Sequence, residues 1–321
     1  MFTCSAASAA GTVLALCAAT AAVATAAAPH YPVTYNGILG YAHFAQPDAP
    51  AAGSSYVTWN TATPAASCMV SRQHPYPVVL VGGTWLNQAD DWAAVSPLLA
   101  DNGYCVYTDN LGSATDAILA QTGDIPTSAQ ELATVVNKVL AATGATKVDL
   151  VGHSQGGGML PRWYLKYGGG ATKVNALVGL EPSNHGTTLS GLTTLGTDLG
   201  LLSIVNSGLN AIGFVSAVEQ EVGSRVNTEL DAGGDTVPGV AYTNIVSKYD
   251  EVVTPYTNQF LTAGAGATVH NILLQDVCPF DLGEHISVVY DHIALRLMLN
   301  ALDPATATAP QCSLVLPIVG G

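Results

Sequence analysis

The chain has 321 residues, of which 49% are hydrophobic and only 10% are charged, so it can bury a large core and does not have the composition of a disordered protein. Its 9 Lys and Arg residues stand against 23 Asp and Glu residues, which gives a formal net charge of -14. This charge repels polyanions, so we expect no nucleic-acid partner and favour a neutral or apolar one.

The first 28 residues differ in composition from the rest of the chain. They contain no charged residue and end in the small residues "AAVATAAA", which is typical of a secretory signal peptide with an Ala-x-Ala cleavage site. A positive charge near the start is missing and Pro29 is a poor first mature residue, so a membrane anchor or a misassigned start is the alternative. We predict a cleaved signal peptide over 1–28, a single domain over 29–321, and a secreted, extracellular protein.

Four cysteines lie beyond this segment, at Cys68, Cys105, Cys278 and Cys312. An even number in an exported protein predicts two disulfides, for which three pairings are possible. We favour Cys68–Cys105 and Cys278–Cys312, because each closes a loop of moderate length and contributes about 3–4 kcal/mol if unstrained. No spacing of histidines and cysteines indicates zinc, so we predict no metal site.

Strands and helices are expected to alternate along the remaining chain. The expected strands are 76–82, 103–110, 147–151, 174–182, 239–247 and 268–275, and the expected helices include 88–103 and 128–143. Ser128 with Glu131 forms a capping-box pattern, and Gly144 follows the last helical residue. This order predicts an α/β fold with a mostly parallel central sheet flanked by helices.

The segment from 186 to 235 interrupts the alternation. It is apolar, dotted with glycines and nearly uncharged, and it lies between two predicted strands. Ordinary core helices are one interpretation. Its position makes a helical cap or lid over a site the more specific one.

The stretch "LVGHSQGGG", residues 150–158, contains a G-x-S-x-G motif around Ser154. It follows a strand of buried type and opens a helical segment, which is the context of a nucleophile elbow. Glycines at the flanking positions let the chain make a tight, strained turn. We therefore predict that Ser154 is an activated nucleophile.

A serine nucleophile needs a histidine base, and in this fold the order along the chain is serine, acid, histidine. His285, in a loop before the last amphipathic helix, is the first choice, and His292 is the second. His185 precedes any plausible acid and is interpreted as a pocket-wall or structural residue. His270 lies in a strand-like run and is expected to be packed.

Asp250 follows a predicted strand directly and is the favoured acid, ahead of its neighbour Glu251 and of Asp276. The oxyanion formed during acyl transfer also needs backbone donors. We predict that these are the amides of Gln155, which follows the nucleophile, and of Thr84, in the loop after the first central strand.

Five segments together resemble the secreted actinobacterial lipases and esterases of the class 2 triacylglycerol lipase family, within the α/β-hydrolases. They are "PVVLVGGTW", "VDLVGHSQGGG", "LEPSNHGTT", "GGDTVPGVAYTNIVSKYDEVVTPY" and "CPFDLGEHI", and the likeness covers about residues 65–305. The resemblance implies an α/β-hydrolase fold, a triad of Ser154, Asp250 and His285, carboxyl-ester hydrolysis, and no cofactor.

The family usually has His-Gly where this chain has Gly82-Gly83, which leaves open how the oxyanion loop is supported. Trp85 and Leu86 are expected to line the acyl entrance or to pack in the core. The expected substrates are acyl esters such as triacylglycerols. We expect the protein to be a monomer that acts on them at a lipid–water interface. An acyltransferase or polyester hydrolase with the same triad is the alternative. A non-catalytic lipid-binding protein is disfavoured, because all three triad positions are filled.

Overall fold

The computed structural model describes residues 29–114, 116–189, 206, 210 and 214–321. The predicted signal peptide over 1–28 lies outside these residues, as does part of the predicted cap. Within the described ranges, no helix has the length and apolar character needed to cross a bilayer.

Seven parallel strands form the sheet, in the order β1-β3-β2-β4-β5-β6-β7. Their bounds are β1 Ser54–Tyr56, β2 Val78–Val81, β3 Val106–Thr108, β4 Val148–His153, β5 Val174–Leu180, β6 Ala241–Val246 and β7 Thr268–Leu273. The predicted parallel sheet flanked by helices is confirmed. The sequence analysis missed β1, because its three half-buried residues make no apolar run.

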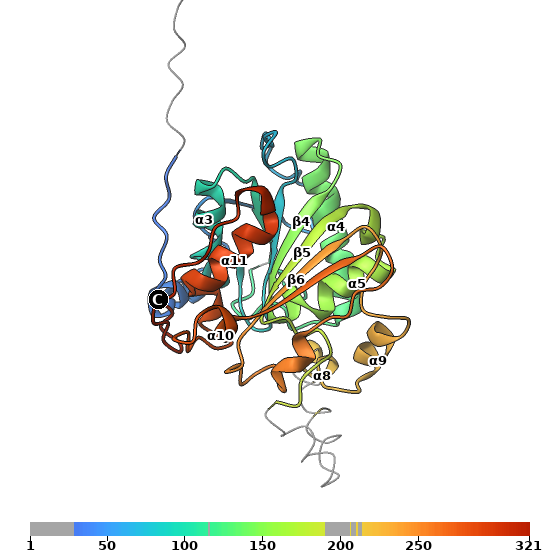
Figure 1. The fold of residues 1–321 in the computed structure, drawn as a ribbon. Coiled ribbons are helices and arrows are strands. Elements are labelled where there is room, and N and C mark those ends of the chain that lie inside the picture. Colours follow the sequence, from blue (N-terminus) through green and yellow to red (C-terminus); the bar gives the residue numbers. More distant parts are fainter. Residues whose placement is uncertain (1–28, 115, 190–205, 207–209, 211–213) are drawn as a thin grey trace, which may run out of the picture.

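Helices cover both faces of the sheet (Figure 1). The longer ones are α4 Ile125–Thr143, α5 Met159–Tyr167 and α11 His292–Leu302, and the shorter ones are α1 Gly37–Tyr41, α2 Gln88–Asp91, α3 Val95–Asp101, α8 Val215–Glu219, α9 Arg225–Asp231 and α10 Leu274–Val277. Val79 and Val81 of β2 pack with α4 and α5. Val78 and Leu80 point the other way and pack with α3 and α11. A strand buried on both faces explains the continuous apolar run in the sequence.

Helix α4 is the helix predicted over 128–143, but it begins earlier, at Ile125. Asp124 is its N-cap, and its carboxylate accepts a hydrogen bond from a backbone N–H in the first turn. The capping box predicted from Ser128 and Glu131 is therefore wrong. The Glu131 carboxylate instead accepts a hydrogen bond of 2.7 Å from the backbone N–H of Gly112.

Two further expectations are corrected by the structure. The stretch 88–103 forms two short helices, α2 and α3, with a turn at 92–94 between them. His270 is exposed rather than packed, because β7 is the edge strand of the sheet.

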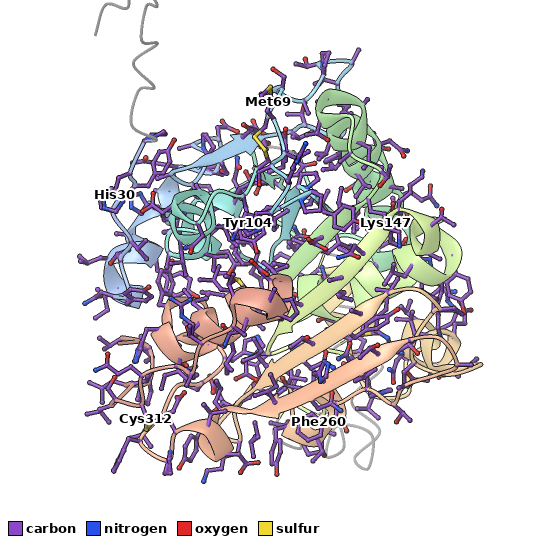
Figure 2. All side chains as sticks on the ribbon, turned by 45° about the horizontal axis from the view of Figure 1, so that its top comes forward. His30, Met69, Tyr104, Lys147, Phe260 and Cys312 are labelled. Atoms are coloured by element: carbon purple, nitrogen blue, oxygen red, sulfur yellow. A yellow bond between two sulfur atoms is a disulfide. The ribbon has the colours of Figure 1, made fainter. Side chains whose placement is uncertain are left out.

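Disulfides join Cys68 to Cys105 and Cys278 to Cys312, the pairs favoured from loop length. The first ties an N-terminal segment to the start of β3, and the second ties the end of α10 to the C-terminal segment. Figure 2 shows side chains filling the space on both sides of the sheet, with Cys312 in the C-terminal region.

Asp149 in β4 is a buried carboxyl whose ionisation we expect to control stability. It is 3% exposed and accepts a hydrogen bond of 2.8 Å from the Asn175 amide. Burial raises the pKa of Asp149 from its ordinary value of 3.8 to about 7, although the Asn175 hydrogen bond acts against the shift. The stability that the neutral carboxyl contributes is therefore complete below about pH 4 and is lost as the pH rises through about 7.

Replacing Asp149 by Asn removes this loss, because the amide does not ionise. We measure the difference in melting temperature between Asp149→Asn and wild type. This difference should be at least about 2 °C more positive at pH 8 than at pH 5, which is the shift that roughly 1 kcal/mol produces in a protein of this size. The exposed Asp276→Asn is the matched control and should change little at either pH. Equal differences at both pH values would show that Asp149 does not titrate in this range.

Candidate active site

Loops that follow four neighbouring strands meet at the carboxyl ends of these strands. Thr84 lies just beyond β2, Ser154 directly after β4, Glu181 directly after β5, and Asp250 a few residues after β6. All the strands are parallel, so their carboxyl ends lie on the same side of the sheet, which is where α/β proteins bind their ligands.

Ser154 lies in a sharp turn between β4 and α5. Its φ is 55°, in the left-handed region that a residue with a side chain adopts only under constraint. A Cβ on Gly152 would lie 1.8 Å from the carbonyl oxygen of Gly156, and a Cβ on Gly156 would lie 2.0 Å from the carbonyl oxygen of Val81. Only glycine fits at either position, so the turn packs tightly on β2 with the geometry of a nucleophile elbow.

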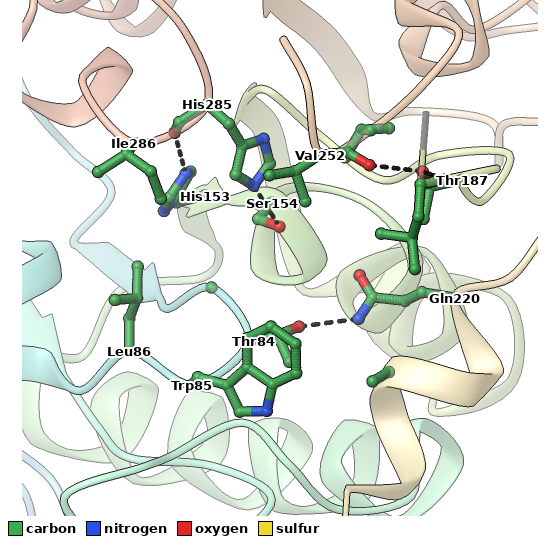
Figure 3. A pocket seen from close by; sticks show the side chains of 14 residues that line it. Thr84, Trp85, Leu86, His153, Ser154, Thr187, Gln220, Val252, His285 and Ile286 are labelled. Atoms are coloured by element: carbon green, nitrogen blue, oxygen red, sulfur yellow. Dashed lines mark hydrogen bonds between the residues drawn. The ribbon is translucent and has the colours of Figure 1, made fainter. Parts of the chain in front are cut away.

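Hydrogen bonds join the side chains of Ser154, His285 and Asp250 into one chain (Figure 3 shows the first two). His285 Nε2 is 3.0 Å from Ser154 Oγ, and His285 Nδ1 is 2.8 Å from Asp250 Oδ2. All three residues are buried, with exposed fractions of 6%, 4% and 5%. The structure thus brings together the three residues predicted as a triad, in an arrangement in which a histidine can take a proton from a serine.

Hydrogen-bond donors surround the Asp250 carboxylate. Oδ1 accepts from the backbone N–H groups of Val252 and Val253, at 2.7 and 2.8 Å. Oδ2 accepts from the Gln259 amide and from His285, both at 2.8 Å. Burial by itself would raise the pKa of Asp250, but His285 and these donors hold it below its usual range. Asp250 is therefore ionised at neutral pH.

The alternative bases have other partners, and the alternative acids are exposed, whereas the triad residues are buried. The two ring nitrogens of His292 contact backbone carbonyl oxygens of the C-terminal segment, at 2.5 and 2.9 Å. His185 Nδ1 is 2.8 Å from a carboxylate oxygen of Asp231. Glu251 and Asp276 are exposed.

His185 also belongs to the one group of described residues with the donor atoms of a metal site, together with Asp231 and Asp235. The Arg162 guanidinium lies 3.4 Å from the Asp231 carboxylate and 3.8 Å from that of Asp235. The cluster is therefore explained as a half-buried salt-bridge network around Arg162, and we assign no metal to it.

The loop after β2 packs against Ser154. A Cβ on Gly83 would lie 3.3 Å from the Ser154 Cβ, and Thr84 lines the same pocket as Ser154. The Gly83 N–H donates a hydrogen bond of 2.8 Å to Asp91 Oδ2. Asp91 thus supports the loop at Gly82-Gly83, whose support the sequence left open.

Asp91 is also paired with His153, a residue that the serine–acid–histidine order excluded as the base. His153 Nδ1 is 2.8 Å from Asp91 Oδ1, and its Nε2 is 2.9 Å from the carbonyl oxygen of His285. Both ring nitrogens face acceptors, so the ring carries two protons. Burial would lower the pKa of His153, but the Asp91 carboxylate and these hydrogen bonds raise it overall.

This Asp91–His153 pair connects the loop of Thr84 to the backbone of His285. Sequence reasoning missed it, because Asp91 lies in a stretch interpreted only as helix. A histidine directly before the elbow serine was the available signal.

A largely apolar pocket adjoins Ser154 (Figure 3). It holds about 770 Å³ of space not filled by atoms, part of it open to solvent. Its apolar lining includes Trp85, Leu86, Leu189, Ala217, Val252 and Ile286. Trp85 and Leu86 thus line the pocket, and the Trp85 ring also packs edge-on against Phe214, with centroids 5.9 Å apart.

Gln220, at the end of α8, joins the described part of the predicted cap region to this site. Its amide donates hydrogen bonds of 2.8 Å to Thr84 Oγ1 and of 3.1 Å to Gln155 Oε1. The predicted cap over 186–235 is described only in part, and its role as a lid stays a prediction. The sequence analysis did not single out Gln220, because no local pattern distinguishes it.

Comparisons with known proteins concern the family and the fold. The model of the family "Lipase (class 2)" matches residues 75–291. A triacylglycerol lipase of Burkholderia plantarii is 37% identical over 114 residues, which are 34% of this chain and 30% of that protein. A triacylglycerol lipase of Pseudarthrobacter phenanthrenivorans is 42% identical over 88 residues, which are 26% of each chain. The matched region thus spans less than a third of either relative's length.

The crystal structure of Aspergillus fumigatus lipase B is similar to this chain, with a TM-score of 0.56 and 22% identity. The similarity covers 75% of this chain and 55% of that one. At this identity the comparison concerns the fold, which is that of the α/β-hydrolases.

We expect Asp91→Asn to weaken the support of the loop at Gly83. The two Asp91 oxygens now accept from the Gly83 N–H and from His153 Nδ1, and in the variant one of them is replaced by an amide N–H₂ that faces a donor. A misplaced loop costs up to about 100-fold in rate. For the ester hydrolysis implied by the sequence, kcat should fall about 10- to 100-fold with little change in KM. Steady-state kinetics measures both constants.

Asp90→Asn is the matched control, since Asp90 is equally buried but accepts from the N-cap of α2, Asn87, rather than from Gly83. It should retain the wild-type kcat. Equal losses in the two variants would mean that packing around α2, rather than the hydrogen bond to Gly83, is responsible.

Proposed function

Since this chain belongs to the class 2 lipase family, we propose that it is a serine carboxyl-ester hydrolase, a lipase or esterase that cleaves acyl esters such as triacylglycerols. The observation that carries the proposal is the buried chain of hydrogen bonds from Ser154 through His285 to Asp250, at the base of an apolar pocket.

In the proposed mechanism, His285 Nε2 accepts the Ser154 proton as the hydroxyl attacks the ester carbonyl. Asp250 holds the imidazole through Nδ1 and stabilises the positive charge that forms on it. The protonated His285 then gives its proton to the departing alcohol. Water, activated by the same histidine, hydrolyses the acyl-enzyme and frees Ser154.

The tetrahedral intermediate carries a negative charge on the former carbonyl oxygen. We assign its stabilisation to the backbone amides of Thr84 and Gln155. Two observations support this: Thr84 lies on the loop packed against Ser154, and Gln155 follows the nucleophile directly in the helical turn Ser154–Gly157. Gln220 donates hydrogen bonds to the side chains of both residues and so holds the two segments together.

The apolar lining of the pocket supports an uncharged acyl chain as the group bound there. The two disulfides support an oxidising compartment, and with the composition of residues 1–28 they support secretion. We propose that the protein acts outside the cell as a monomer on lipid or other acyl esters.

The first test is the initial hydrolysis rate of p-nitrophenyl esters of increasing acyl-chain length. We expect hydrolysis of long-chain esters. In Ser154→Ala, kcat should fall at least about a thousandfold, because the nucleophile is lost. Asp250→Asn should also lose about a thousandfold or more, since the His285 imidazole is left in the wrong tautomer.

Ser113→Ala, a serine outside the pocket, is the control and should keep wild-type activity. Activity that survives in Ser154→Ala would show that Ser154 is not the nucleophile. Hydrolysis of short-chain esters alone would show that the pocket does not admit long acyl chains and that the protein is an esterase.

A further inference from the structure

A second carboxyl group lies buried behind the Asp250 carboxylate. Glu181 follows β5 directly, has no exposed surface and has a φ of 47°, in the left-handed region. Ser247 joins the two residues, because its backbone N–H donates to Glu181 Oε1 at 2.8 Å and its carbonyl oxygen accepts from the Asp250 backbone N–H at 3.3 Å. A buried acid so close to a buried carboxylate needs a physical explanation, because two neighbouring negative charges without a cation are costly.

The two oxygens of the Glu181 carboxyl have different surroundings. Oε1 accepts a hydrogen bond of 2.8 Å from the backbone N–H of Ser247. Oε2 is completely buried and accepts no hydrogen bond from any described residue. The Ser247 N–H therefore makes Oε1 an acceptor, which leaves Oε2 as the oxygen that can carry a proton.

The charges nearby agree with this placement of the proton. Asp250 is held as a carboxylate by His285, by the Gln259 amide and by two backbone amides. The titratable group that acts on Glu181 is Asp250, with His285 on its far side and the His153 ring next to that of His285, its centroid 5.0 Å away. Burial, followed by the negative charge of Asp250, raises the pKa of Glu181 well above its usual value.

We propose that Glu181 is a positioning residue, a neutral carboxylic acid whose Oε2–H donates a hydrogen bond to the Asp250 carboxylate. This inference rests on the proposed function, because it assigns Asp250 and His285 their roles there. The donated proton takes up part of the negative charge of Asp250. Asp250 then stabilises the His285 imidazolium less strongly, so His285 stays neutral, and able to act as a base, at lower pH.

Two substitutions separate a neutral donor from an ionised or merely structural glutamate. Glu181→Gln keeps an oxygen to accept from the Ser247 N–H and places an N–H₂ donor where Oε2 now stands. We expect it to keep the acid limb of the pH profile of kcat/KM within about 0.3 unit of wild type. Glu181→Leu has a similar size and no donor, and should move the acid limb to higher pH by on the order of 0.5–1 unit.

The same shift should appear in the titration of the His285 ring followed by NMR in a Ser154→Ala background. This readout needs no activity, so it remains usable if Ser154 proves not to be the nucleophile. Failure of the proposed function and failure of the present inference are therefore distinguishable.

An infrared difference spectrum provides the direct test and does not need the leucine variant to fold. Wild type minus Glu181→Gln at neutral pH should show the loss of a protonated carboxylic acid band. Loss of an ionised carboxylate band, or an acid limb that moves to lower pH in Glu181→Gln, would overturn the proposal. An unchanged acid limb in folded Glu181→Leu would also overturn it, since Glu181 would then have no influence on Asp250.

Discussion

The close approach of the turn after β4 to the end of β2 is the constraint on which the site depends. The chain passes so near the carbonyl oxygens of Val81 and Gly156 that no side chain fits at Gly156 or Gly152. This contact holds Ser154 in its left-handed conformation and presents its hydroxyl at the carboxyl edge of the sheet. It also brings the loop of Thr84 against the serine, so one packing contact positions the proposed nucleophile and one proposed oxyanion donor.

Buried charge is the second organising feature. Asp250 pairs with His285 at the site, and Asp91 pairs with His153 beneath it. The two pairs are linked, because His153 Nε2 contacts the carbonyl oxygen of His285 while Asp91 accepts a hydrogen bond from Gly83. A buried carboxylate that loses its hydrogen-bonding partner is costly, which makes both pairs effective at holding a geometry. The residues that carry the proposed chemistry are thus fixed by a network larger than the triad.

The pocket couples this network to the segment between β5 and β6. Leu189 and Ala217 provide apolar lining, while Gln220 donates hydrogen bonds to the side chains of Thr84 and Gln155. An interaction of this kind ties the acyl-binding surface to the residues proposed to stabilise the oxyanion. The same contacts would then affect both the substrate specificity and the reaction rate.

By itself, the sequence determined the parallel order of strands and helices and the elbow around Ser154, because these depend on apolar periodicity and on glycines at fixed positions. Loop length favoured the two cysteine pairs among three possible pairings, and the structure decided them. The sequence also pointed to Asp250 and His285, through their places in the chain order. The exposure of His270, the Asp91–His153 pair, Gln220 and the buried Glu181 were decided only by the tertiary structure. Each of these depends on which residues distant in the chain become neighbours, and hydrogen bonding and desolvation between such residues leave no periodic pattern in the sequence.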